Sequence, residues 1–404
     1  MKLISPNLSR YQRSQRQARL LGVLAVLSIL AAWGIGLFLA QADLMPAVQR
    51  ALPEATRFER QTTDVYVAYG KDEIEEPLGY VALGEASGYG GPMTVAVAVD
   101  PAGTVTNAVI ADHRETPAWM DQITENEFMS SLTEKSYADP FQVGKDVDGV
   151  TGATTSSKAL AEAVLNGSRK AAQVIGLSVE TPPAPRLQFG IPEITLLMLF
   201  AVGFFAHQRK FKHKKKVRWV SLLTGLLILG FIYNSPLTLA YINKFLLGFW
   251  PQWQTHLYWY LLIGGILFVY TVENKNPYCQ WFCPFGAAQE VMGLVGGAKV
   301  YSPRQFRDLL KWLQRGLAWL AIVLALIYRN PGLSSFEIFG TLFSLTGSNF
   351  QFILLALVLV TSLFIRRPWC TYLCPLDPVT DFIKMTRKWV IELWQEKIKT
   401  SDET

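Results

Sequence analysis

The sequence predicts a membrane α-helical bundle of six transmembrane helices, joined to an α+β domain that lies outside the cytoplasm. Half of the 404 residues are hydrophobic, which is typical of an integral membrane protein. Residues 43–186 carry 21 acidic and 11 basic side chains, whereas the rest of the chain carries 11 acidic and 27 basic ones. This division of charge indicates membrane topology and argues against nucleic acid as a partner. All four cysteines fall in two similar frames, each beside an apolar run.

Residues 1–42 are expected to form a cytoplasmic N-terminus and the first transmembrane helix. An uncharged run extends from Leu20 to Ala40, and at about 1.5 Å per residue it is long enough to cross roughly 30 Å of hydrocarbon. The arginines that precede it keep the N-terminus in the cytoplasm; they are Arg10, Arg13, Arg16 and Arg19. Ala40-Gln41-Ala42 resembles a signal-peptidase site, so cleavage is the alternative to a retained helix.

Residues 43–180 have the pattern of a soluble α+β domain, and a proline-rich linker follows at 181–186. Alternating or β-branched stretches predict strands at 61–68, 78–85, 93–99 and 104–110,. Helices are expected at 119–132 and 156–175. Because the first helix leads out of the cytoplasm, we expect this domain on the periplasmic or extracellular side.

Residues 187–383 are expected to form a five-helix membrane domain, and residues 384–404 a cytoplasmic tail. The apolar runs are 189–206, 219–242, 257–272, 312–328 and 350–365,. The connection at 207–218 is strongly basic and therefore belongs in the cytoplasm. Alternation of the runs then places both cysteine frames and both termini on the cytoplasmic side of a bacterial inner membrane, with lipid around the helices.

The cysteine frames share the pattern P-aromatic-C-x-aromatic-x-C-P. They hold Cys279 and Cys283, and Cys370 and Cys374. Cysteines four residues apart face the same way on a helical turn. The proline after each second cysteine suits the start of a new helix, where the helix dipole favours a thiolate.

Four such thiolates predict a metal centre. An iron–sulfur cluster is the first expectation, as [4Fe-4S] before [2Fe-2S], and a structural zinc ion is the alternative. Buried cysteines without metal remain a further interpretation. A disulfide is disfavoured because cytoplasmic thiols are kept reduced.

A second motif covers residues 148–157, where small and hydroxyl-bearing residues open a helix. Glycine permits a tight backbone there, and free N–H groups at a helix start can hold a phosphate, although ordinary capping uses the same residue types. The segment resembles the D-x-x-[ST]-G-A-[TS] motif of FMN-binding domains of the NqrC and RnfG type, which occur in the sodium-pumping NADH:quinone reductase and in the Rnf complex. The resemblance implies that a flavin transferase attaches FMN through its phosphate to Thr154. The resemblance also implies that the neighbouring motif residues bind the cofactor; they are Asp148, Thr151, Gly152, Ala153, Thr155 and Ser156.

Two more stretches resemble the same family. Gly88-Tyr89-Gly90-Gly91 is similar to its G-Y-x-G loop, and residues 113–117 are similar to its H-x-E-T-P motif. The resemblance implies flavin contacts from Tyr89, Gly90, His113, Glu115, Thr116 and Pro117. Ala118 and Trp119 follow where the family often has glycine, so the contacts to the flavin ring are expected to differ. By itself, His113 has the pattern of an exposed loop histidine.

The combination resembles the NosR/NirI and PceC membrane flavoproteins, and the NapH type shares its cysteine part. NosR-type members usually continue into a ferredoxin domain, whereas residues 384–404 contain no cysteine, so the shorter PceC-like form is the better match. The resemblance implies electron transfer from a cytoplasmic donor or the quinone pool, through the cluster and covalent FMN, to an external redox protein. The alternatives are a redox-sensing regulator or maturation factor without turnover, and a metal-handling channel.

No catalytic residue is assigned, and whether the chain is an enzyme in its own right stays open. A bound quinone is a further cofactor that this layout allows. His207, His213 and His256 are weak candidates for haem or quinone contacts, since loop or interfacial roles fit them better.

Overall fold

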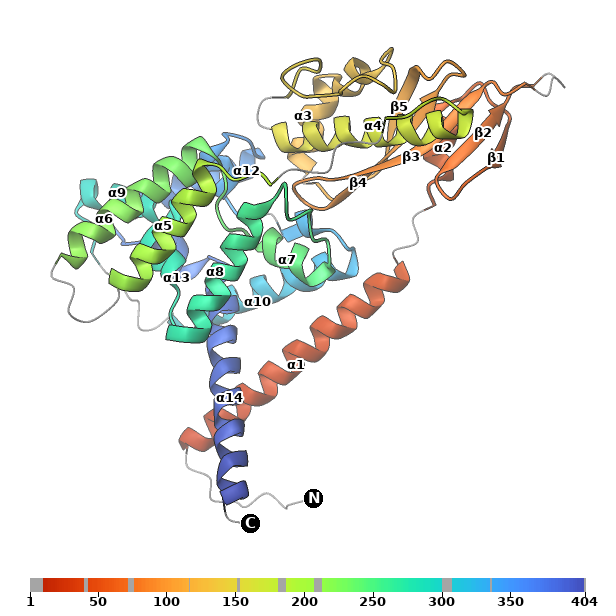
Figure 1. The fold of residues 1–404 in the computed structure, drawn as a ribbon. Helices are drawn as coiled ribbons and strands as arrows, with labels where there is room; N and C mark the ends of the chain where they lie inside the picture. The colour runs from red at the N-terminus through yellow and green to blue at the C-terminus, as the bar shows by residue number, and fades with distance from the viewer. Residues whose placement is uncertain are drawn as a thin grey trace.

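The computed structural model describes residues 10–39, 43–71, 76–115, 117–150, 153–180, 187–206, 213–299, 307–334 and 336–402. Figure 1 shows an α+β domain at one end of the molecule and a group of helices beneath it. Helix α14 (Leu376–Asp402) runs from that group toward the opposite end, and α1 (Arg10–Leu39) runs from below the α+β domain to the same end. The expected combination of a helical part with a small α+β domain is confirmed. The 181–186 linker and the 40–42 cleavage motif lie outside the described residues.

The α+β domain is built on an antiparallel sheet. Within the described residues it has five strands in sequential order. They are β1 (Arg57–Arg60), β2 (Val65–Tyr69), β3 (Gly79–Ser87), β4 (Pro92–Val99) and β5 (Val105–Asp112). Four match the predicted strands within a few residues, while β1, which is short and mostly exposed, was missed because it lacks an apolar pattern.

Strand β4, which lies between β3 and β5, is buried on both faces, and its sequence alternates valine and alanine. Val95 and Val97 face the core beneath α4 (Thr154–Ile175), and Ala96 and Ala98 face α2 (Met45–Ala51). Helix α4 crosses the sheet closely, since a Cβ at Gly84 would collide with the carbonyl oxygen of Ala163. The helix predicted at 119–132 is divided into α3 (Pro117–Glu125) and a 3₁₀ turn, η1 (Phe128–Leu132).

The remaining elements form the helical part. The longer helices are α5 (Ile191–Ala206), α6 (Lys214–Thr224), α8 (Leu257–Glu273), α9 (Pro284–Gly296), α10 (Arg307–Ile327) and α12 (Asn349–Ser362). Short helices lie between them: α7 (Leu239–Leu247), η4 (Pro331–Ser334), α11 (Phe339–Phe343) and α13 (Pro368–Tyr372). Two segments are π-helical, η2 (Gly225–Ile232) and η3 (Tyr278–Phe282).

Among the described residues, two helices are long and apolar enough to cross a membrane, Arg19–Leu39 and Asp308–Ile327. Three of the other predicted spans form shorter apolar helices, Ile191–Ala206, Leu257–Glu273 and Asn349–Ser362. At about 1.5 Å per residue, helices of 14 to 17 residues fall short of a full bilayer core.

The span expected at 219–242 is not one helix. The run begins in α6, continues through the π-helical η2, leaves helical structure after Ile232 and resumes only in α7. Pro236 explains the break, because proline lacks an N–H group and disfavours helix at the residue before it. The freed donors find new partners: Leu237 N donates to the Tyr278 hydroxyl at 2.7 Å, and Leu239 N donates to the Glu337 carboxylate at 2.9 Å.

Candidate functional site

The two cysteine frames adopt related local structures. Cys279 lies in η3 and Cys370 in α13, while Cys283 and Cys374 directly precede the prolines that lead into α9 and α14. Cys283 caps α9, and its sulfur accepts a hydrogen bond from Gly286 N at 3.5 Å. The predicted position of each second cysteine at a helix start is therefore confirmed.

The structure brings the four thiols into one electrostatic environment. Burial raises the pKa of all four, to about 12 for Cys283, and neighbouring thiols raise it further: Cys370 acts on Cys283, and both Cys370 and Cys279 act on Cys374. Burial therefore opposes the thiolate that the helix dipole was expected to favour, whereas a bound metal ion displaces the thiol proton. The arrangement suits ligation rather than nucleophilic chemistry.

Among the described residues, no group of three or more His, Cys, Asp or Glu side chains is arranged to hold one metal ion. A zinc ion requires its four ligands within about 2.3 Å of one point, whereas an iron–sulfur cluster binds its cysteines through different iron atoms.

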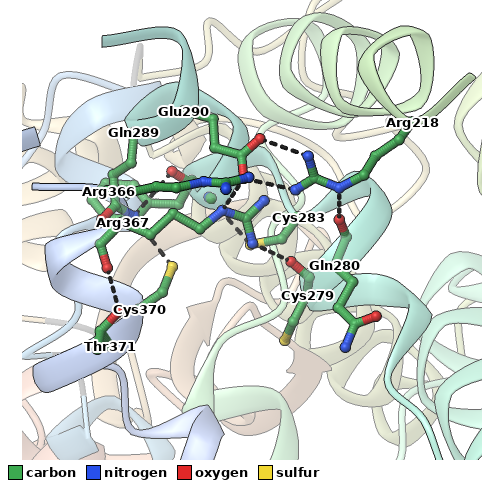
Figure 2. Close-up of polar contacts among 12 residues, drawn as sticks. Arg218, Cys279, Gln280, Cys283, Gln289, Glu290, Arg366, Arg367, Cys370 and Thr371 are labelled. Atoms are coloured by element: carbon green, nitrogen blue, oxygen red, sulfur yellow. Dashed lines mark hydrogen bonds and ion pairs between the residues drawn. The ribbon is translucent and has the colours of Figure 1, made fainter. Parts of the chain in front are cut away.

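A buried charge network joins the two frames (Figure 2). The carboxylate of Glu290, in α9, accepts hydrogen bonds from Arg218 at 2.7 and 2.9 Å and from Arg366 at 3.1 Å. Arg367 Nε lies 2.9 Å from the same carboxylate, and its Nη1 donates to the carbonyl oxygen of Cys279 at 2.7 Å. Burial raises the pKa of Glu290, but the three guanidinium groups outweigh that effect and lower it overall.

This network leaves an excess of positive charge beside the cysteines. Three arginines face one carboxylate, and the Arg367 charge opposes the rise that burial causes in the pKa of Cys279 and Cys370. A thiolate-ligated cluster is anionic, so such an excess stabilises it. Arg367 also has a left-handed backbone, with φ of 52°, a conformation that non-glycine residues keep only where the surroundings hold it.

Amide groups complete the surroundings of the sulfurs. Asn276 Nδ2 donates to Cys279 Sγ at 2.9 Å, and Gln289 Nε2 donates to Cys370 Sγ at 3.2 Å. The oxygen of Gln289 accepts from Trp369 N at 3.0 Å, so one side chain on α9 positions the second frame. Hydrogen bonds to cluster sulfurs tune reduction potentials.

The other predicted site lies at the start of α4. Thr154 and Thr155 occupy its first turn and are exposed, whereas Ala153 and Ser156 are buried. The N–H groups of a first turn lack partners within the helix, so an exposed hydroxyl there can carry a phosphate group at the positive end of the dipole. Asp148 is exposed nearby in the chain, and Thr151 and Gly152 lie outside the described residues.

Glu115 connects the motifs that the sequence placed in this site. It is fully buried, and its carboxylate accepts hydrogen bonds from Ser156 Oγ at 2.7 Å and from Gly90 N at 2.8 Å. Burial raises the pKa of Glu115, and these bonds partly oppose the rise. One carboxylate therefore holds the glycine loop against the start of α4.

The other residues predicted to contact the flavin lie in the sequence near Tyr89 and Glu115. His113 is half-buried, and its Nδ1 has no hydrogen-bond partner among the described residues. Pro117 is exposed at the start of α3, and Thr116 lies outside the described residues. The Tyr89 ring meets Trp119 edge to face, with centroids 4.5 Å apart, so Trp119, the second residue after the H-x-E-T-P motif, packs on the glycine loop.

The histidines considered for haem or quinone are peripheral. His213 is exposed beside α6, and His256 is half-buried with its Nδ1 2.9 Å from the Thr255 hydroxyl. His207 lies outside the described residues.

Sequence patterns did not reveal several residues of these sites. They are Asn276, Gln289, Glu290 and Arg367. A lone charge in an apolar stretch was the available signal for Glu290, since charges in such stretches are costly unless they have partners. The amides gave no signal of their own.

Two domain families match this chain. Residues 88–168 match the FMN-binding domain, and residues 255–303 and 350–392 match the 4Fe-4S binding domain. The first range contains the glycine loop, Glu115 and the start of α4. The second contains all four cysteines. FMN and a 4Fe-4S cluster are thus the supported cofactors, in agreement with the prediction.

Several curated proteins are similar to parts of this chain. Protein NirI of Paracoccus denitrificans is 32% identical over 201 residues, which are 45% of this chain and 28% of NirI. A component of the proton-translocating ferredoxin:NAD(+) oxidoreductase complex of Clostridium ljungdahlii is 33% identical over 102 residues, 24% of this chain and 55% of that component. Regulatory protein NosR of Pseudomonas aeruginosa is 28% identical over 213 residues, 47% of this chain and 28% of NosR.

The matched regions thus span between about a quarter and just over half the length of these relatives. The comparisons support a NosR/NirI-like fusion of an FMN-binding domain with a 4Fe-4S binding domain.

Proposed function

We propose that this chain is a membrane electron-transfer protein that carries electrons between a quinol or cytoplasmic donor and a redox protein outside the membrane. The observation that carries the proposal is the presence, in one chain, of an FMN-binding domain and of four cysteines gathered behind a positively charged network. FMN exchanges one or two electrons and a cluster exchanges one, so the pair suits a junction between two-electron and one-electron carriers.

The chain's own residues supply the ligands and the surroundings. Cys279, Cys283, Cys370 and Cys374 would hold the cluster, while Arg367, Asn276 and Gln289 offset its negative charge or donate to its ligands. Thr154 would carry FMN as a phosphoester made by a flavin transferase. Its exposed place on the first turn of α4 supports this role, because the transferase must reach the hydroxyl.

For the division of the chain, we propose the ranges 1–42, 43–180, 181–186, 187–383 and 384–404, with six membrane crossings in a bacterial inner membrane. The two long apolar helices support two of the crossings. The shorter helices α5, α8 and α12, and the broken run through α6 and η2, would provide the other four crossings together with the non-helical segments that adjoin them, where buried partners satisfy the backbone. The flavin domain would then lie on the periplasmic or extracellular side.

The direct test is a cofactor analysis of the full chain, coexpressed with a flavin transferase and purified without oxygen. We expect a peptide containing Thr154 to carry the mass of FMN, and we expect iron and sulfide in the ratio of a [4Fe-4S] cluster, with an absorption band that bleaches on reduction. An unmodified Thr154 peptide, or zinc in place of iron, would refute the assignment.

A regulatory role without turnover is the second candidate, because one relative is named as a regulatory protein. Electron transfer from a quinol analogue to a soluble one-electron acceptor, measured in proteoliposomes, separates the two functions. Sustained turnover supports the carrier. A single reduction of the bound cofactors without turnover supports the sensor.

A further inference from the structure

The flavin-binding loop contacts the helical part of the chain rather than standing free. Lys244, on α7, is buried and donates a hydrogen bond to the carbonyl oxygen of Gly88 at 2.8 Å. Tyr241, one turn earlier on α7, has its ring centroid 5.8 Å from that of Tyr89. Figure 1 shows α7 directly beneath the α+β domain. One short helix therefore holds the loop that also contacts Glu115.

Backbone contacts support the same interface. A Cβ added at Gly332, in η4, would lie 3.0 Å from the carbonyl oxygen of Glu115, and one added at Gly91 would lie 3.1 Å from the Phe249 ring. These distances are tighter than ordinary packing, so glycine is what lets the two surfaces meet.

Opposite charges meet across this interface. Burial lowers the pKa of Lys244 to about 8, and the Glu115 carboxyl opposes that shift; Lys244 likewise opposes the rise that burial causes in the pKa of Glu115. A buried ammonium that donates to a carbonyl and feels the charge of a carboxylate is destabilised when either group is moved away. The contact is thus suited to hold the domain in one position.

A series of contacts also connects α7 to the second cysteine frame. Glu337 accepts the backbone N–H of Leu239, the first residue of α7, and two residues later Phe339 begins α11. Phe339 packs in an aromatic group with Phe285 and Trp369, at centroid distances of 4.9 and 6.3 Å. Trp369 directly precedes Cys370 in the chain.

Contacts on the other side of α11 link this aromatic group to the flavin-binding loop. A Cβ at Gly340 would lie 4.0 Å from the Trp119 ring, which packs on Tyr89. The segment 337–343 thus lies between the flavin-binding loop and the second cysteine frame.

From these contacts we infer that Lys244 is a positioning residue, which holds the flavin domain docked so that electrons pass singly between flavin and cluster across the segment 337–343. Each transfer oxidises one of the two cofactors by one electron and reduces the other by one, so no further carrier is needed between them. The inference rests on the proposed function, and it explains how an external flavin and inner cysteines can act together without a bound quinone.

The test is the magnetic interaction of the two cofactors in the full chain. Microwave power saturation of the one-electron-reduced flavin EPR signal is measured with the cluster oxidised and with the cluster reduced. A nearby reduced cluster speeds flavin relaxation, so we expect the half-saturation power to rise on cluster reduction. In Lys244→Met we expect that rise to be lost, while flavin and iron contents stay unchanged.

Lys275→Met is the matched control, because Lys275 is exposed beyond the end of α8, and it should keep the full relaxation effect. Gly332→Val is the second variant; it forces η4 away from Glu115 without removing a charge, and it should also lose the effect. Both cofactors bound without any relaxation effect in the unaltered protein, or a full effect in both docking variants, would overturn the inference alone. Missing flavin or iron in the unaltered protein would instead overturn the proposed function.

Discussion

At the scale of single residues, the candidate flavin site depends on one hydroxyl. Thr154 and Thr155 are adjacent and both exposed on the first turn of α4. We expect Thr154→Ala to abolish covalent flavin, and Thr154→Ser to retain it because the hydroxyl stays at the same place. Flavin fluorescence of the denatured protein on a gel measures the result. Thr155→Ala is the control and should keep its covalent flavin. Loss of the flavin only in the Thr155 variant would show that Thr155, and not Thr154, is the attachment site.

Arg367 should set the reduction potential of the cluster. Its charge lies beside the cysteines and stabilises the more negative, reduced form, so Arg367→Gln should lower the midpoint potential. The expected shift is on the order of 50 mV, which corresponds to about 1 kcal/mol of lost attraction. A redox titration followed by EPR measures it.

Arg366→Gln is the control for that shift. The Arg366 side chain is 49% exposed, against 16% for Arg367, so water screens its charge more strongly. Its variant should shift the potential less. An equal or larger shift in the Arg366 variant would show that Arg367 has no special position.

Glu290 should be the stability determinant of the network. Replacing it by glutamine leaves three arginines without their shared carboxylate, and breaking a buried ion pair in this way costs about 3 kcal/mol. We expect a clear fall in the thermal midpoint in detergent, together with loss of iron. Glu392→Gln removes an exposed pair with Arg19, which is worth at most about 1 kcal/mol, and it should change neither value.

At the scale of elements, close packing of η2 on the first cysteine frame is the critical contact. A Cβ at Gly225 would collide with the carbonyl oxygen of Phe282, next to Cys283. We expect Gly225→Ala to displace the frame and cost about 1–3 kcal/mol, seen as a lower thermal midpoint and weaker iron retention. Gly264→Ala, on α8 with open space around it, should be neutral or slightly stabilising. Equal effects of the two variants would contradict the packing argument.

Some of these elements could be predicted from the sequence and others could not. Strong local patterns predicted β2 to β5, α4 and the helix starts after Cys283 and Cys374, because each depends on neighbours along the chain. The run 219–242 looked like one span, yet Pro236 and the partners Tyr278 and Glu337 favour a broken path. Those partners lie far away in the sequence, so a hydropathy pattern does not contain them. The Asn234-Ser235-Pro236 turn was the one local sign.

At the scale of the whole molecule, contacts between residues that lie far apart in the sequence also limited the prediction of the two sites. The cysteine repeat and the two flavin motifs predicted which residues gather, since spacing and residue type carry that information. The charge network around Glu290 and the docking contact of Lys244 depend on pairs that are 72 to 156 residues apart. Only the folded chain brings these partners together: the first set joins the two cysteine frames, and the second joins the flavin-binding loop to α7.

Topology gives the remaining prediction. We expect the flavin domain and the end of α14 to lie on opposite sides of the membrane, since Figure 1 shows α14 running away from the domain. Lys158, on α4, and Lys388, on α14 with 60% of its side chain exposed, are natural reporters. A membrane-impermeant amine reagent should modify Lys158 alone in right-side-out vesicles and Lys388 alone in inverted ones, as read by peptide mass spectrometry. Detergent-solubilised protein, in which both lysines should react, is the control. Modification of both from the same side of intact vesicles would exclude the six-crossing arrangement, and the flavin and the cysteines would then need no membrane between them.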